Sequence, residues 1–595
     1  MNALSRREVL RTSAALAATA ALPDGLLAAA SAAADRPNVL LILTDDQGYG
    51  DLSCHGNPVL KTPNLDRLHG QSIRLTDFHV APMCSPTRGQ LMTGMDCLRN
   101  GAMATCLGRH MPRLGIPTIA EAFAAGGYRT GIFGKWHLGD TYPYRPMDRG
   151  FQEAASFNGF GLVCADEYWC NDYFDPWYLH NGQRKRGSGY CTDFWFDRAM
   201  AWMDDRRRAR EPFFAYLPTN APHFPHWVEK KYREPYEGRG PAGFYGMLAN
   251  LDENIGRLEE FLARTGLGDN TILLFLSDNG YAGDGPNPYN AGLRGGKCAY
   301  YEGGHRVPCF VCWPGGGLRQ PGDIETPAQV QDVLPTLLDL CRLPTPREAH
   351  FDGTSLAGLL RGEKLADRKF VVQYFQNSVK AWDAAVVWNQ WRLVRGRELY
   401  DVRADRGQQH NVADLHPDVV TAMRGHYEKW WASVEGEVDK FSPVLIGAAK
   451  ATDTVLTCCE WQDVRADGAE SVRVAVKLPP KGGPWNVRVE RDGVYEFELR
   501  RWPKESDLAI SAAAPAFQGR VGTIVEGKAF LIASARLAVD GTEQSQAARP
   551  DDKAVTFRLK LKAGPAKIHG WFCDAQGKEV CGAFFAYVHS PAAAG

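Results

Sequence analysis

Residues 84 to 88 place a cysteine two positions before a proline and four positions before an arginine, in the order Cys-Ser-Pro-Thr-Arg. The flanking residues predict a turn that leads into a helix. A nucleophile at the start of a helix meets unpaired backbone N–H groups and the positive end of the helix dipole, and both favour a developing anion. Arg88 lies one turn further on and adds a fixed positive charge. A buried structural cysteine beside a proline turn has the same five letters, so other segments must decide between the two readings.

Two acidic turns follow apolar runs of strand length. Asp45 and Asp46 come directly after residues 38–44, and Asp278 and Asn279 come directly after residues 271–277. Crowded carboxylates have raised pKa values unless a cation compensates them. Their hard oxygen donors suit Ca²⁺ or Mg²⁺ better than Zn²⁺. Either turn alone is an ordinary turn sequence, but the pair, each at the end of a buried strand, favours a metal site.

Three more segments carry side chains that bind anions or move protons. Lys135 and His137 lie two positions apart and share one side if this segment is extended. Prolines constrain the loop around His223, and Lys297 follows a glycine pair that permits close backbone approach to a ligand. Taken singly, these are equally a solvated lysine, a structural histidine or a flexible surface loop. Glu302 and Arg306, which follow, are expected to brace the loop by an ion pair.

In their order and spacing, these motifs resemble the type I sulfatases, whose signature is Cys-x-Pro-x-Arg. The match runs from residue 37 to about residue 435. The resemblance implies an alkaline phosphatase-like sulfatase fold. It also implies that a formylglycine-generating maturation enzyme oxidises Cys84 to Cα-formylglycine (3-oxoalanine). Residue 84 would then act as an aldehyde hydrate, not as a thiol.

The resemblance assigns a role to each candidate residue. The catalytic set is Cys84, Arg88, Lys135, His137, His223, Asp278 and Lys297. The metal ligands are Asp45, Asp46, Asp278 and Asn279, completed by an oxygen of the modified residue 84, and the ion is Ca²⁺ with Mg²⁺ as the alternative. In the implied mechanism the hydrate attacks sulfur after Asp278 takes its proton, and His223 or Lys297 protonates the leaving oxygen. His137 assists the collapse that expels sulfate.

The expected function is therefore that of a sulfuric ester hydrolase, which cleaves an aryl or carbohydrate O-sulfate. One alternative is a phosphonate monoester or phosphodiester hydrolase of the same superfamily, which shares the aldehyde and the anion site. Another is an inactive exported protein that binds sulfated glycans. An insert rich in aromatic and acidic residues, 166–178, predicts either a packed cover of the catalytic domain or one wall of a sugar site.

The positions of these motifs agree with a wound α/β domain at residues 35–343. The apolar runs at 38–44, 213–217, 271–277 and 307–312 predict strands buried on both faces, and 118–125 and 247–264 predict helices between them. This alternation indicates a mostly parallel sheet flanked by helices. Ligands bind such sheets beyond the carboxyl ends of the strands, where both acidic turns lie.

Two smaller domains are expected after the α/β domain. Residues 344–437 resemble the small α+β C-terminal subdomain of sulfatases, with a strand ending at Asp401 and a helix over 416–431. Residues 438–595 predict an accessory β-sandwich-like domain. Its expected strands are 472–478, 485–489, 493–500, 529–537, 554–561 and 583–588. Packing against the catalytic domain is its expected role, with carbohydrate binding as the alternative.

The first 34 residues predict export. A twin-arginine pattern, Arg6-Arg7, precedes an alanine-rich apolar stretch and a run of small residues suited to cleavage. The Tat export machinery carries folded proteins, which leaves time for modification of Cys84 before export. No later stretch is long and apolar enough to span a bilayer. The mature protein is expected to be periplasmic or extracellular.

Bulk composition limits the choice of partners. The 595-residue chain has a formal net charge of −1, so no long-range field attracts nucleic acid or anionic membrane. The expected partners are therefore a sulfated small molecule or glycan, the maturation enzyme and the Tat machinery. The 15 cysteines form no zinc pattern. Cys573 and Cys581 flank a turn sequence and predict a disulfide across a hairpin.

Overall fold

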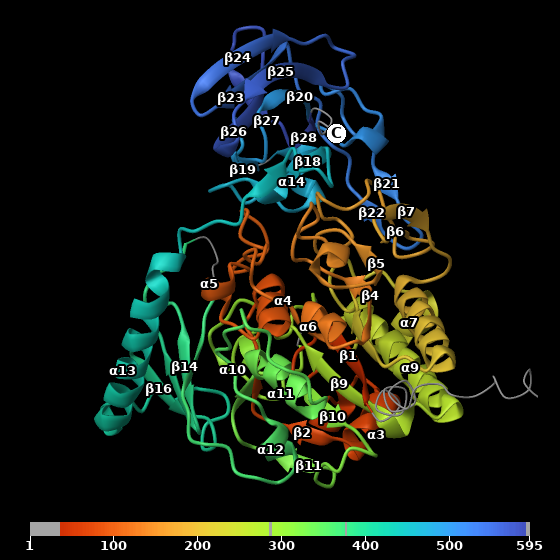
Figure 1. The fold of residues 1–595 in the computed structure, drawn as a ribbon, viewed down its shortest axis with the longest axis vertical. Coiled ribbons are helices and arrows are strands. Elements are labelled where there is room, and N and C mark those ends of the chain that lie inside the picture. The colour runs from red at the N-terminus through yellow and green to blue at the C-terminus, as the bar shows by residue number, and fades with distance from the viewer. Residues whose placement is uncertain (1–35, 285–287, 375–377, 476, 591–595) are drawn as a thin grey trace, which may run out of the picture.

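The computed structural model describes residues 36–590, apart from 285–287, 375–377 and 476. The predicted twin-arginine signal at 1–34 lies outside the described residues. Figure 1 shows a wide α/β body, a helix and small sheet at one side, and a β-rich region stacked at one end of the long axis. Within the described ranges, no helix has the length and apolarity needed to cross a membrane.

A ten-stranded mixed sheet forms the centre of the α/β body. Its strand order is β11-β2-β10-β9-β1-β8-β4-β5-β6-β7. The inner strands β9, β1, β8, β4 and β5 run parallel, whereas β10 runs antiparallel to β9. The bounds are β1 (Asn38–Thr44), β2 (Ile73–Leu75), β4 (Arg129–Lys135), β5 (Glu153–Phe157), β6 (Trp177–His180), β7 (Gln183–Arg186), β8 (Phe213–Pro218), β9 (Thr271–Ser277), β10 (Cys309–Cys312) and β11 (Gly322–Ile324). The predicted mostly parallel, helix-flanked sheet is confirmed.

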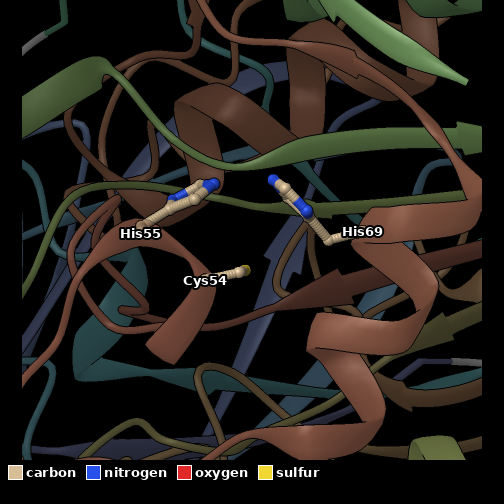
Figure 2. Close-up of side chains that lie close together, drawn as sticks. All are labelled: Cys54, His55 and His69. Atoms are coloured by element: carbon tan, nitrogen blue, oxygen red, sulfur yellow. The ribbon is translucent and has the colours of Figure 1, made fainter.

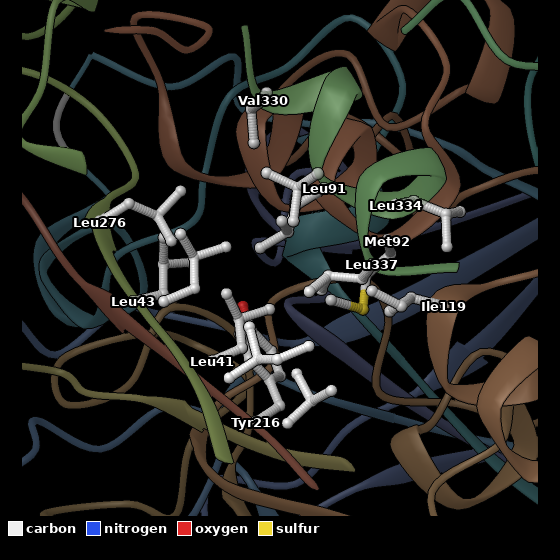
Figure 3. Close-up of a cluster of buried hydrophobic side chains, with 14 of the residues drawn as sticks. Leu41, Leu43, Leu91, Met92, Ile119, Tyr216, Leu276, Val330, Leu334 and Leu337 are labelled. Carbon is white, nitrogen blue, oxygen red and sulfur yellow. The ribbon is translucent and has the colours of Figure 1, made fainter. Parts of the chain in front are cut away.

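Helices cover both faces of this sheet, which explains why β1 is apolar at successive positions. Leu41 and Leu43 pack with one set of helices, and Leu40 and Ile42 pack with the other. Figure 3 shows the first of these cores, where Leu41 and Leu43 lie near Leu91 and Met92. The first face carries α4 (Cys84–Thr93), α6 (Ile119–Ala125) and α11 (Val333–Leu340), and the second carries α3 (Pro63–Gln71), α7 (Cys191–Ala209) and α9 (Ala242–Thr265). A strand buried on both faces therefore has apolar residues at successive positions, without the polar alternation of a half-exposed strand.

A four-stranded antiparallel sheet follows the α/β body. Its order is β13 (Phe370–Val372), β14 (Ala385–Trp388), β15 (Trp391–Val394) and β16 (Glu398–Asp401). Helix α13 (Pro417–Val434) packs on it through Met423 and Tyr427. Both the strand ending at Asp401 and the helix expected from residue 416 are present. The short helices of the body are α5 (Cys97–Asn100), α8 (Lys230–Arg233), α10 (Glu302–His305) and α12 (Ala357–Leu360).

Residues 438–590, termed here the accessory region, contain two facing sheets. One has the order β17-β19-β26-β23-β24, with β27 beside β26, and the other has the order β18-β28-β20-β25. The bounds are β17 (Val444–Ile446), β18 (Asp453–Thr457), β19 (Trp485–Val489), β20 (Gly493–Arg500), β23 (Ser534–Val539), β24 (Thr542–Ala547), β25 (Val555–Leu561), β26 (Gly564–Cys573), β27 (Glu579–Gly582) and β28 (Phe585–His589). Their shared core also takes in Met111, Tyr144, Cys164 and Ala165 of the α/β body. The accessory region therefore packs on the body without a solvated gap between their cores.

Two sequence predictions in the accessory region are wrong. Residues 472–474, where the strand expected at 472–478 should begin, belong instead to helix α14 (Ala469–Val474). Cys573 and Cys581 are free thiols. The register of β26 and β27 pairs Cys581 with Phe572 and places an irregularity at Cys573, so the two cysteines are not opposite each other.

We expect Leu41→Ala to lower the free energy of unfolding by about 2–5 kcal/mol, because it leaves a cavity in a core with no exposure to water. Urea unfolding followed by tryptophan fluorescence measures the change. Leu531→Ala removes the same atoms from a side chain that is 87% exposed, and its unfolding midpoint is expected to match that of the unaltered protein. Equal effects of the two substitutions would contradict the packing described for β1.

Candidate active site

Cys84 is the first residue of helix α4 and lies almost wholly buried, with 1% of its surface exposed. Two neighbours fix this helix start. Ser85 Oγ donates to the backbone oxygen of His137 at 3.0 Å, and Thr87 Oγ1 donates to that of Ala81 at 2.9 Å. Burial raises the pKa of the Cys84 thiol, although the charges of Lys135 and Lys297 oppose the shift. An unmodified thiol is therefore mostly protonated here, which makes it a weak nucleophile.

Arg88 lies one turn along α4 and binds the carboxylate that follows strand β9. Its Nη2 and Nε donate to Asp278 Oδ2 at 2.8 and 3.1 Å, and its Nη1 donates to the backbone oxygen of Lys135 at 2.9 Å. Burial and the charge of Asp45 raise the pKa of Asp278 to about 6, against the opposing effect of Arg88. Arg88 thus ties α4 to the ends of two central strands.

The two acidic turns meet because β1 and β9 are neighbours with Thr44 opposite Ser277. The backbone N–H of Asp46 donates to Asp278 Oδ1 at 3.1 Å. Asn279 Nδ2 donates to Asp46 Oδ1 at 2.8 Å. Three carboxylates and one amide are thus gathered at one edge of the sheet, as the strand ends predict.

Two lysines face these carboxylates. Lys135 Nζ donates to Asp45 Oδ2 at 2.6 Å, and Lys297 Nζ donates to Asp46 Oδ1 at 2.5 Å. Burial by itself raises the pKa of Asp46, but Lys297, His223 and Lys135 outweigh it and hold the pKa well below the usual range. The pKa of Lys297 is raised: burial opposes the shift, and the charge of Asp46 is the largest effect that produces it. The site is thus a cluster of paired charges, not a neutral core.

Two buried oxygens at the acidic turns have no hydrogen-bond partner, Asp45 Oδ1 and Asn279 Oδ1. A buried acceptor without a protein partner can be satisfied by a bound ion or water. One ligand atom each from Asp45, Cys84 and Asp278 lies within 4.8 Å of the others. Hard oxygen donors in this number fit a divalent ion such as Ca²⁺ or Mg²⁺, whereas a thiol at position 84 is a poor ligand for either.

The two predicted histidines lie beside this cluster. His137 Nε2 donates to the backbone oxygen of Thr105 at 3.2 Å, and its Nδ1 is buried without a partner. His223 Nδ1 donates to the backbone oxygen of Phe224 at 2.8 Å, which leaves Nε2 facing Asp46 Oδ2 at 3.6 Å. Burial and the charge of Lys135 lower the pKa of both rings, to about 3 for His223 even though Asp46 opposes the shift there. Both imidazoles are therefore neutral and each offers a ring nitrogen for proton transfer.

A cavity of about 540 Å³ opens onto this cluster. Four of the predicted residues line it: Cys84, His137, His223 and Lys297. The others, including Arg88 and Lys135, are buried behind them. Thr105, which also lines the cavity, was not predicted, because nothing in its local sequence marks it. Several lining residues belong to the accessory region, and no sequence motif indicated them either.

The loop that carries Lys297 is fixed from the neighbouring sheet. Arg306 Nη1 lies 3.0 Å from Glu302 Oε2, as the expected ion pair requires. Arg392 on β15 donates to Glu302 Oε1 at 2.7 Å and to Asp77 Oδ1 at 2.6 Å. These buried pairs hold the chain just after Lys297 against the small antiparallel sheet.

The aromatic insert at 166–178 is a packed cover. Tyr173, Phe174 and Tyr178 are buried in the core that α7 and α9 share. No insert residue described in the structure lines the cavity. Of the two readings of this segment, packing is the one that the structure supports.

A second group of possible ligands lies elsewhere in the α/β body. Figure 2 shows His55 and His69 facing each other with Cys54 nearby. Their sulfur and nitrogen donors suit a soft ion. Burial and the charge of Asp66 raise the pKa of the Cys54 thiol, which disfavours the thiolate that would bind such an ion. Both imidazole rings also pack against the edge of Phe310, so this group is explained by aromatic packing.

Comparisons with known proteins agree with the geometry. The family model described as Sulfatase matches residues 37–343. Human "Arylsulfatase A" is 35% identical over 384 residues, which are 58% of this chain and 72% of that protein. The dog "N-acetylgalactosamine-6-sulfatase" is 31% identical over 431 residues, with 65% and 80% covered. The crystal structure of Ps i-CgsB in complex with k-i-k-neocarrahexaose is 27% identical with a TM-score of 0.61, over 68% of this chain and 95% of that one.

We expect Arg88→Gln alone to destabilise the protein by about 3–5 kcal/mol, because it leaves the Asp278 carboxylate buried without its partner. Adding Asp278→Asn is expected to recover part of the loss, so the two effects are not additive. Urea unfolding of the two single variants and the double variant measures this coupling. The same cycle on the exposed pair Arg558 and Glu496 is expected to give about 0–1 kcal/mol. Equal coupling energies in both cycles would contradict the claim that burial makes the Arg88 and Asp278 pair stronger than an exposed pair.

Proposed function

The chain belongs to the sulfatase family and is a sulfuric ester hydrolase, and we propose that it cleaves an aryl or carbohydrate O-sulfate with a formylglycine formed at Cys84. The observation that carries the proposal is the place of Cys84, at a helix start on the cavity wall between Lys297 and two neutral histidines. When formed, this residue supplies, as its hydrate, a hydroxyl nucleophile in place of a poorly ionised thiol. The names of the relatives, which include an arylsulfatase and a carbohydrate sulfatase, support this range of esters.

Cationic side chains orient the sulfate in the proposed reaction. Lys297 reaches the cavity, and Lys135 lies behind it, each paired with a carboxylate at the acidic turns. Fixed positive charges in a site without bulk water stabilise negative charge that spreads over the sulfate oxygens in the transition state. The start of α4 adds its backbone N–H groups to this anion site. Arg88 keeps the helix and the carboxylates in place.

The proton transfers are assigned to titratable residues that line the cavity or are buried next to it. Asp278, whose pKa is raised by burial, is the proposed base for the nucleophilic hydroxyl. Lys297 Nζ protonates the leaving oxygen, whereas the neutral His223 ring carries its proton on Nδ1 and offers Nε2 only as an acceptor; both lie beside Asp46. His137, whose Nδ1 has no partner, assists the release of sulfate at the cysteine position.

Asp45, Asp46, Asp278 and Asn279 would hold a divalent ion, Ca²⁺ or Mg²⁺, together with an oxygen on residue 84. The unpartnered Asp45 Oδ1 and Asn279 Oδ1 support this assignment. When bound, the ion supplies positive charge that polarises the ester sulfate and offsets the crowded carboxylates. The twin-arginine pattern at Arg6-Arg7 supports export by the Tat machinery to the periplasm or the exterior, after a maturation enzyme has acted on Cys84.

We expect Cys84→Ala to reduce sulfate release by at least about a thousandfold, because it removes the nucleophile while the anion site remains. Ion chromatography of sulfate released from aryl and sugar sulfates measures turnover. Mass spectrometry of the peptide around residue 84 in the unaltered protein is expected to show the aldehyde or its hydrate. Cys312→Ala, at a half-buried cysteine on β10, is the matched control. Full turnover by Cys84→Ala would overturn the proposal.

Asp45→Asn is expected to weaken Ca²⁺ binding at least about tenfold, or about 1.4 kcal/mol, because a charged oxygen ligand becomes an amide. Calorimetric titration of the full-length protein after removal of metal by a chelator measures the dissociation constant. His69→Ala serves as the control, since it alters the second group of possible ligands in Figure 2. If only His69→Ala weakens binding, the ion sits at that second group and not at the acidic turns.

A further inference from the structure

One wall of the catalytic cavity comes from outside the part of the chain that the family model matches. That model ends at residue 343, whereas Arg465, Asp467–Glu470 and Thr523–Val525 line the cavity together with Cys84 and His223. Both segments belong to the accessory region. The accessory region therefore does more than pack on the α/β body: it supplies part of the lining of the catalytic cavity.

The first of these segments is fixed to the α/β body through its backbone. The N–H of Ala165 donates to the oxygen of Asp467 at 2.8 Å, and the N–H of Ala469 donates to the oxygen of Val163 at 2.7 Å. These bonds form a short antiparallel bridge between Cys164 and Gly468. The bridge joins a segment of the accessory region to a segment of the α/β body, and so it holds this wall of the cavity in position.

The second segment lies on a hairpin, β21 (Phe517–Gln518) and β22 (Thr523–Ile524), which is also seated on the body. The N–H of Arg520 donates to Asp172 Oδ2 at 2.7 Å. Gly522 packs so closely on Trp227 that an added Cβ would lie 2.0 Å from Nε1 of that ring. Only glycine fits this contact, so the turn of the hairpin is docked and not merely adjacent.

The wall also contacts Thr105, a residue that hydrogen-bonds to His137. Arg465 Nη1 donates to Thr105 Oγ1 at 3.0 Å and lies 3.5 Å from Asp467 Oδ2. The backbone oxygen of the same Thr105 accepts the bond from His137 Nε2 at 3.2 Å. The accessory region thus contacts the residue that orients His137. Its only cation on this wall, among the described lining residues, is already engaged by a carboxylate and a hydroxyl.

The surface beyond the sulfate site is mostly apolar. Phe224 is 53% exposed and Val525 is 59% exposed, and Ile524 and Trp227 line the same cavity. Exposed aromatic and aliphatic groups that line one cavity suit the flat apolar face of a ring. Aryl groups and pyranose sugars both offer such a face.

The charge of this outer wall is negative. Glu470 lines the cavity, and the carboxylate of Asp467 is shared with Arg465. A second anionic group on the substrate would therefore meet a carboxylate without gaining a free cation. The outer wall thus differs from the sulfate site, where the cations Lys135 and Lys297 lie close together.

From this wall we infer that the accessory region forms the leaving-group subsite, and that it selects sulfate esters of a ring that carries no second negative charge. The inference rests on the proposed function, since it places the ester at Cys84. Ile524 and Val525 contact the ring, and Glu470 excludes an additional carboxylate or sulfate near it. The accessory region is then a specificity element built on the catalytic cavity.

Binding to the full-length Cys84→Ala protein tests this inference without turnover. Calorimetry with phenyl sulfate, carboxyphenyl sulfate, a pyranose monosulfate and inorganic sulfate gives four dissociation constants. The double change Ile524→Ala and Val525→Ala is expected to weaken binding of the ring esters about tenfold, with no change for inorganic sulfate. Glu470→Gln is expected to improve binding of carboxyphenyl sulfate about fivefold relative to phenyl sulfate. Tighter binding of phenyl sulfate or of the sugar sulfate distinguishes the two kinds of ring.

Two control variants carry matched changes next to the wall. Val521 is 40% exposed on the same hairpin but does not line the cavity, and Glu526 is likewise exposed outside it. Val521→Ala and Glu526→Gln are expected to leave all four constants unchanged. The inference is overturned if the lining and control variants behave alike. Failure of the matured, unaltered protein to release sulfate would instead overturn the proposed function, because the binding constants do not depend on turnover.

Discussion

Crowding of negative charge at one edge of the central sheet is the constraint on which the site depends. Asp45 and Asp46 follow β1 directly, and Asp278 follows its neighbour β9, so three carboxylates meet in a buried place. Such a cluster persists only if cations offset it. Lys135 comes from the end of β4, Arg88 from α4 and Lys297 from a loop beyond β9, so three separate elements supply the compensation. The same cations are what a sulfate needs once it displaces part of this pairing.

The sequence predicted this arrangement because its signals are local and their positions follow from sheet geometry. An apolar run with no polar alternation indicates a strand buried on both faces, and parallel strands end at the same edge. Helix α6 begins within one residue of its predicted start, and β1 and β9 have the predicted bounds. The resemblance to the sulfatase motifs added the roles of Lys135 and His223, which the residue types alone leave open. Such features can be predicted from the sequence because each depends on only a short stretch of chain.

The predictions that fail depend on register or on contacts between distant segments. Residues 472–478 alternate apolar and charged side chains like a strand, but α14 begins at Ala469 after the bridge to Val163. Cys573 and Cys581 flank a turn, yet an irregularity at Cys573 shifts the pairing of β26 and β27. The wall at Arg465 and Glu470 left no local signal at all. Its residues have no distinctive local pattern, and they reach the cavity because the accessory region packs on residues of the α/β body.

In the proposed function, this contact gives the cavity two different charge environments. Around residue 84, cations from the α/β body are paired with carboxylates, and Lys297 among them lines the cavity. Further out, Glu470 and the apolar side chains of the hairpin present a wall with no free cation among its described residues. A highly anionic substrate would gain at the first place and lose at the second, whereas a monosulfate with an apolar ring face gains at both. Since Thr105 joins Arg465 to His137, the outer wall and the catalytic ring also share one point of support. In the proposed function, selection of the leaving group and positioning of His137 therefore depend on the same contact between the accessory region and the body.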